Sequence, residues 1–136
     1  MKNSRNWVFD TGILYLYFGG DRRAIELLRG IGKGTPNGFT CEPNVAELYY
    51  KTCEKLGRDT AMIRYTSLRH SSLVITAPDE RLTLHAGELM CTYRNQLSLT
   101  DAYVISLAKD VHGHLFTTDP RIARLKIVPT EFLELK

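Results

Sequence analysis

The fold is decided by the stretch NWVFDT at residues 6–11, in which an apolar strand runs directly into an acidic residue and the start of a helical segment. Near the end of the chain the pattern returns as LFTTD at residues 115–119. In a parallel sheet Asp10 and Asp119 would both emerge at the carboxyl edge, where open α/β folds place their ligand sites. The two stretches therefore predict an α/β protein with a site at that edge.

Two further acids lie near the starts of predicted helices. Glu47 lies four residues after Pro43, which suits the first position of a helix. Asp101 lies directly after Thr100, at the start of another helix. If these helices follow strands of the same sheet, all four acids converge in one crevice. Clustered carboxylates repel one another, and their hard oxygen atoms suit Mg²⁺ or Mn²⁺. We therefore predict a divalent-metal site.

Each acid also has an ordinary structural explanation. Asp10 can cap the following helix, Glu47 can pair with Lys51 one turn later, and Asp119 can begin a turn. Asp101 is harder to explain in this way, because the apolar residues three, four and seven positions later place its carboxylate above the buried face of its helix. All of these explanations must hold together to dismiss the cluster, so we favour the metal site.

Length and composition predict one globular domain spanning residues 1–136, since the chain is 43% hydrophobic and long enough for one core. The formal charge of +3 is compatible with a nucleic-acid partner.

The three cysteines form no CxxC pair, which argues against a zinc site or a disulfide framework and for a reducing cytoplasm. One apolar stretch superficially resembles a secretory signal sequence, but Asp10 interrupts it. No transmembrane span is predicted.

Apolar runs alternate with helical patterns along the chain, which predicts βα units and a parallel sheet. Strands are expected at residues 6–9, 39–41, 73–75, 114–118 and 126–128, and the third is expected to be buried. Helices are expected at residues 11–18, 21–30, 43–57, 58–69, 82–93 and 102–111. The predicted fold class is a three-layer α/β/α sandwich with a parallel sheet of about five strands.

Four motifs carry a family resemblance: the strand ending in Asp10, PNVAEL at residues 43–48, LSLTDA at residues 97–102, and LFTTD at residues 115–119. Their order and spacing resemble the acidic motifs of PIN-domain nucleases, and the size of the chain most resembles VapC-type toxins of toxin–antitoxin operons. The resemblance implies an endoribonuclease that hydrolyses RNA with Mg²⁺ or Mn²⁺. It also implies a homodimer and an antitoxin that lies along the active-site groove.

The resemblance assigns all four acids to the metal site, with Thr11 or Thr118 as polar support. We expect Asp10 and Asp101 to bind the principal metal ion, and Asp119 to support it or a second ion. Glu47 would orient or deprotonate the attacking water.

Four basic residues are candidate contacts to RNA phosphates: Arg121, Arg124, Lys33 and Arg23. Two positions depart from the family pattern. Gly12 stands where a polar or aliphatic residue is more usual, and Ile122 stands where an acidic or polar residue often follows the last acid.

Other enzyme classes fit less well. DTG at residues 10–12 matches the aspartic-protease triplet, but that class is all-β and this chain continues into helices. GIGKGT at residues 30–35 follows a helix and lacks the spacing of a phosphate loop. A receiver domain would need an Asp on the strand at residues 73–75. The alternatives left open are a PIN-fold scaffold that binds RNA or protein, and a housekeeping RNA-processing nuclease.

Overall fold

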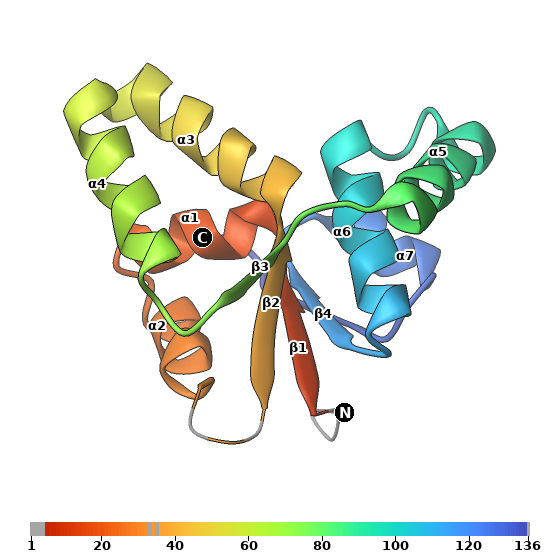
Figure 1. Cartoon of the computed structure of the whole chain (residues 1–136), viewed down its shortest axis with the longest axis horizontal. Coiled ribbons are helices and arrows are strands. Elements are labelled where there is room, and N and C mark those ends of the chain that lie inside the picture. The colour runs from red at the N-terminus through yellow and green to blue at the C-terminus, as the bar shows by residue number, and fades with distance from the viewer. Residues whose placement is uncertain (1–4, 33, 35, 136) are drawn as a thin grey trace.

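The computed structural model describes residues 5–32, 34 and 36–135. Five strands form one parallel sheet in the order β3-β2-β1-β4-β5 (Figure 1). The strands are β1 (Asn6–Phe9), β2 (Asn37–Cys41), β3 (Val74–Thr76), β4 (His114–Thr117) and β5 (Thr130–Phe132). This arrangement confirms the predicted fold class.

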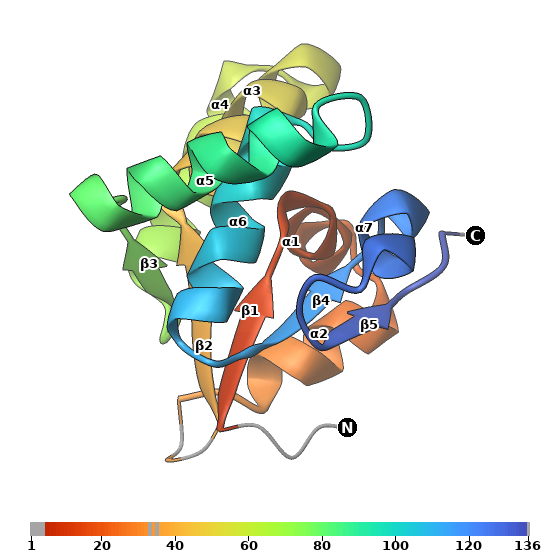
Figure 2. The same cartoon turned by 90° about the vertical axis from the view of Figure 1, so that its right-hand side faces the viewer.

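Helices cover both faces of the sheet (Figures 1 and 2). In the described residues they are α1 (Thr11–Phe18), α2 (Arg22–Arg29), α3 (Glu42–Leu56), α4 (Arg58–Arg69), α5 (Glu80–Tyr93), α6 (Leu99–Asp110) and α7 (Pro120–Leu125). Helices α1 to α4 pack on one face, and α5 to α7 pack on the other. None of these helices is long and apolar enough to span a membrane.

The two central strands supply apolar side chains to both layers. Phe9 and Phe116 belong to the core beneath α1 to α4, whereas Val8 and Leu115 belong to the core beneath α5 to α7. All four are fully buried. Successive strand residues point to opposite faces, so a strand buried on both faces is apolar along most of its length. This requirement explains the continuous apolar runs in the sequence.

The order of the strands reverses at the border between β1 and β4. From the central strand β1 the chain first builds β2 and β3 on one side, and later builds β4 and β5 on the other. Such a switch point leaves a crevice outside the carboxyl ends of the strands. Asp10 directly follows β1 there, and Asp119 comes two residues after the end of β4.

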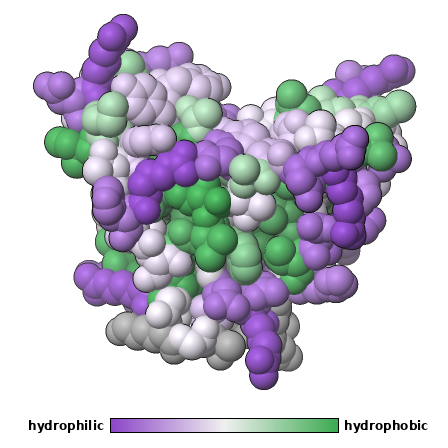
Figure 3. Space-filling view, in the orientation of Figure 1, coloured by the Kyte–Doolittle hydropathy of each residue, from purple (hydrophilic) through white to green (hydrophobic). Residues whose placement is uncertain are grey.

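Two expectations about strands were wrong. We expected a buried third strand, but β3 is an edge strand and Val74 is 47% exposed. Figure 3 accordingly shows apolar surface in the middle of the face on which β3 lies in Figure 1. The fifth strand is residues 130–132 rather than 126–128, because Asp119 and Pro120 begin the short helix α7. Lys126 then ends that helix in a left-handed conformation, with φ of 52°.

Gly12 is required by a close approach between α1 and the residue after β4. A Cβ atom at position 12 would lie 2.0 Å from Thr118 Oγ1 and 3.1 Å from Thr118 Cβ. The departure from the family pattern at Gly12 therefore has a steric reason, because any larger residue would push these two segments apart.

We predict that Gly12→Ala destabilises the protein by about 1–3 kcal/mol through overpacking, although Ala is the better helix former. The control is Gly87→Ala in α5, where the added Cβ has no neighbour within 4 Å. That change should stabilise the protein by roughly 0.5–1 kcal/mol. Urea unfolding measures both effects, and a similar gain in both variants would contradict the close approach.

Candidate active site

The four acids line one pocket of about 530 Å³ at the carboxyl edge of the sheet. They reach it from four parts of the chain: Asp10 from the end of β1, Glu47 from α3, Asp101 from α6 and Asp119 from the start of α7. Glu47 lies in the second turn of α3 rather than the first, because the helix already begins at Glu42. The structure therefore brings together residues that are far apart in sequence.

Asp10 is the most buried of the four acids, at 4% exposure. Its Oδ1 accepts a hydrogen bond of 3.0 Å from the Ile13 N–H, so Asp10 caps α1. Its Oδ2 accepts a hydrogen bond from the Thr117 hydroxyl. Burial raises the pKa of Asp10 to about 7, in spite of these hydrogen bonds. A charge at this position is costly without a nearby cation.

Thr117 is the polar supporting residue that the sequence analysis missed. Its hydroxyl donates to Asp10 and accepts a hydrogen bond of 3.0 Å from the Asp119 N–H. It thus connects the two acids that follow the central strands. The contact between Thr117 and Asp10 follows from the strand register, because β1 and β4 pair Phe9 with Phe116 and so place Asp10 beside Thr117.

The two threonines that we expected in this role differ. The Thr11 hydroxyl donates to the Asn44 carbonyl at 3.3 Å and accepts from Asn44 Nδ2 at 3.1 Å, which ties α1 to α3. Thr118 lines the pocket, packs against Gly12 and donates a backbone hydrogen bond to Asp10. Thr118 therefore contacts an acid through its backbone, whereas Thr11 shapes the pocket through Asn44.

Asp101 has a structural function in addition to its place in the pocket. Its N–H donates to Ser98 Oγ at 3.1 Å, and its Oδ2 accepts from the Ser98 N–H at 3.0 Å, so the two residues form a capping box. Burial raises the pKa of Asp101, and the negative charges of Asp119 and Glu47 add to that effect. Asp101 therefore also resists ionisation.

Each of the two outer acids forms an ion pair with a basic side chain of the protein. Arg121 donates to both oxygens of Asp119, from Nη2 at 2.9 Å and from Nε at 3.3 Å. Burial alone would raise the pKa of Asp119, but Arg121 outweighs burial and holds this pKa below its usual value. Lys51 Nζ lies 3.4 Å from Glu47 Oε2, as the spacing of four residues predicted.

These residues suit a hard divalent cation. Their ligand atoms are carboxylate oxygens, and the buried Asp10 and the half-buried Asp101 repel each other while bonding only to neutral groups among the described residues. In the described part of the chain, however, no three acids, histidines or cysteines are already gathered in a ligating arrangement. The ion pairs with Arg121 and Lys51 give a reason, since they turn the outer carboxylates toward other partners.

The candidate RNA contacts separate into two groups. Arg121 lines the pocket, together with Lys51 and Lys55, which the sequence analysis did not propose as RNA contacts. These lysines lie four and eight residues after Glu47, on one face of α3, and that spacing was a usable signal.

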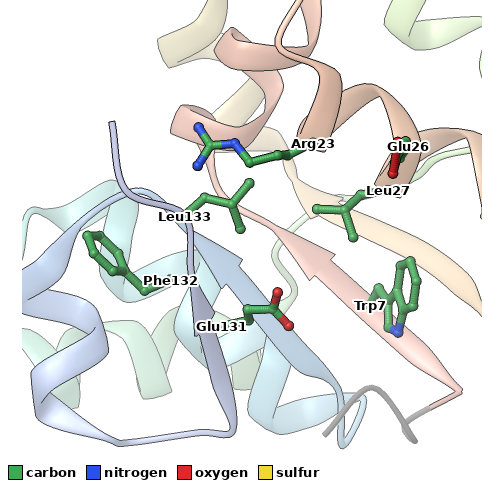
Figure 4. Close-up of a pocket in the computed structure, with 7 residues that line it drawn as sticks. All are labelled: Trp7, Arg23, Glu26, Leu27, Glu131, Phe132 and Leu133. Carbon is green, nitrogen blue, oxygen red and sulfur yellow. The ribbon is translucent and has the colours of Figure 1, made fainter. Parts of the chain in front are cut away.

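Two other candidates are not among the described residues that line the pocket. Arg124 is exposed on α7 and is not among the described residues that line the pocket. Arg23 lines a different pocket beside Leu27 and Leu133 (Figure 4), where it bonds to Asp21. The structure therefore does not bring Arg124 and Arg23 to the pocket of the four acids. Lys33 lies outside the described residues.

Several solved structures share this fold. VapBC-1 from nontypeable Haemophilus influenzae has 17% sequence identity and a TM-score of 0.71, covering 93% of this chain and 97% of that one. VapC20 of Mycobacterium tuberculosis, a sarcin-ricin loop cleaving toxin, has 16% identity and a TM-score of 0.74, covering 95% and 98%. DNA-bound VapBC from Salmonella typhimurium has 13% identity, the same coverage and a TM-score of 0.74. No curated protein sequence matches the chain.

The sequence itself identifies the family. The family model of the PIN domain matches residues 7–128, a range that contains all four acids and Thr117. The resemblance drawn from the acidic motifs is thereby confirmed. The chain belongs to the PIN domain family.

Proposed function

We propose that this protein is a divalent-metal-dependent endoribonuclease and the toxin of a toxin–antitoxin pair. The observation that carries the proposal is the convergence of four carboxylates from four elements in one pocket at the switch point of the sheet. Membership of the PIN domain family and the fold shared with VapC toxins support it.

In this proposal the inner acids hold the metal ion. Asp10 and Asp101 would hold the principal Mg²⁺ or Mn²⁺, and Asp119 would support it or a second ion. When bound, the ion would supply charge relief on the phosphoryl oxygens and help to activate water. Glu47 would orient the attacking water or accept its proton. The Thr117 hydroxyl keeps Asp10 and the start of α7 in register, because it bonds to both.

The basic residues of the pocket suit an RNA strand. Arg121, Lys51 and Lys55 are placed to contact phosphates, which position a nucleic acid without reading its sequence. Tyr15 lines the same pocket and offers a ring on which an unpaired base can stack. We therefore propose single-stranded or looped RNA as the substrate.

We also propose an antitoxin partner, a homodimer and a cytoplasmic location. The antitoxin is supported by the VapBC complexes that share this fold. The location agrees with the three free cysteines, Cys41, Cys53 and Cys91, since thiols persist in a reducing compartment.

One observation favours a second candidate, a PIN-fold scaffold that binds RNA or protein without cutting it. Three acids cap helices, and both outer acids already have a cationic partner. The carboxylates therefore have structural functions that need no metal. A scaffold would bind RNA and leave it intact with every metal, which separates it from either a toxin or a housekeeping nuclease.

We predict that the purified protein cleaves RNA with Mn²⁺ or Mg²⁺ and that EDTA abolishes cleavage. Asp101→Asn should lower the rate by about 10²- to 10³-fold, because it removes a charge that acts on the reacting centre. Asp21→Asn is the control, since Asp21 also accepts backbone hydrogen bonds at a helix start, from Arg23 and Ala24, but lies outside the pocket. Cleavage that survives exhaustive chelation, or that Asp101→Asn leaves at the wild-type rate, would contradict the proposal.

We also predict that the metal-free protein loses stability between about pH 4 and pH 7. Burial raises the pKa of Asp10 from 3.8 to about 7. In this window the folded protein keeps a proton that the unfolded chain has released, so rising pH favours unfolding. Asp10→Asn removes this effect.

As the pH rises across this window, Asp10→Asn should therefore become steadily more stable relative to wild type. Thermal melts in the presence of a chelator measure this difference. Asp21 has a pKa lowered to about 2, so its contribution is complete above pH 4 and is lost only at lower pH. The difference between Asp21→Asn and wild type should consequently stay constant. Parallel curves for wild type and Asp10→Asn would show that Asp10 is not a buried acid of raised pKa.

A further inference from the structure

Three Asp-x-Arg sequences stand at helix starts, and two of them form the same ion pair. In these two, the arginine backbone N–H and Nε donate to Oδ1 of the aspartate, and Nη2 donates to Oδ2. The Nη2 to Oδ2 distance is 2.9 Å for both Arg23–Asp21 and Arg121–Asp119. In the third, Arg81 pairs with Asp110 instead of Asp79. The ion pair thus forms outside the pocket as well as in it, and it does not by itself require a functional site.

The surroundings of the two pairs differ. Arg23 is held from a second side, because its Nη1 donates to the Glu134 carbonyl at 2.9 Å. The guanidinium of Arg121 donates only to Asp119 among the described residues, and its side chain is 52% exposed. Arg121 lines the pocket and also interacts electrostatically with Asp101. Arg121 is thus the pair member that is free to change partner.

We propose that Arg121 is an exchangeable counter-ion that couples RNA binding to metal binding. While its guanidinium donates to both oxygens of Asp119, it competes with a divalent cation for that carboxylate. A phosphodiester in the pocket offers the guanidinium two oxygens in the same planar arrangement. Arg121 then moves from Asp119 to the phosphate, and Asp119 is released toward the metal. This inference rests on the proposed function of the pocket.

The exchange needs only a side-chain movement. The start of α7 stays fixed by the Asp119 N–H bond to Thr117 and by the Arg121 N–H bond to Asp119. Ion pairs as exposed as this one shift an equilibrium by only about two- to fivefold, so a substrate phosphate can compete with it. By linkage, the phosphodiester and the metal must each raise the affinity for the other.

The test is titration calorimetry with Mn²⁺, with and without a short single-stranded DNA oligonucleotide whose integrity is checked afterwards. Without the oligonucleotide, Arg121→Ala should bind Mn²⁺ roughly two- to fivefold more tightly than wild type. The oligonucleotide should tighten Mn²⁺ binding in wild type and do so less in Arg121→Ala, which should also bind the oligonucleotide more weakly. Arg23→Ala removes the matched pair outside the pocket and should behave as wild type.

Two results would separate this inference from the proposed function. If wild type binds Mn²⁺ and cuts RNA, but Arg121→Ala shows the same Mn²⁺ affinity or the same coupling, Arg121 is not the exchangeable counter-ion and the nuclease proposal stands. If wild type neither binds Mn²⁺ nor cuts RNA, both are wrong.

Discussion

The burial of the Asp10 carboxyl at the end of the central strand is the constraint on which the site depends. An ionised carboxylate with 4% exposure is unfavourable unless hydrogen bonds and a cation offset its lost hydration. The Ile13 N–H and the Thr117 hydroxyl supply the hydrogen bonds, and they bind α1 and β4 to the same point. Burial still raises the pKa of Asp10 to about 7, so these neutral partners do not offset it fully. The proposed function assigns the remaining partner to a divalent cation.

Capping and function coincide in this pocket. A helix that follows a strand needs an acceptor for its first N–H groups, and Asp10 and Asp119 supply one at the sheet edge where a ligand site forms. Asp101 does the same for α6 through its capping box with Ser98. The ordinary explanation of each acid therefore does not exclude the proposed functional one. This is also why Asp21, a cap outside the pocket, is a useful control.

The layers of the fold and the meeting of the four acids at one edge of the sheet could be predicted from the sequence, because apolar runs and helix caps are local patterns. The prediction failed after Asp119, where the six-residue helix α7 is too short to show a period and displaces the last strand to residues 130–132. Thr117 was missed because its partner Asp10 is set by the register of β1 against β4, which a single sequence does not contain. The ion pair between Arg121 and Asp119 is local, but its position beside the other acids depends on the whole sheet.

The most direct test of the central claim is the stabilisation of the fold by Mn²⁺, measured by thermal melts of wild type, Asp10→Asn and Asp21→Asn. A ligand bound only by the folded state adds about 2.7 kcal/mol at a hundredfold excess over its Kd. This account predicts that amount for wild type and for Asp21→Asn, and much less for Asp10→Asn. Equal stabilisation of all three proteins would contradict it, because the ion would then bind elsewhere.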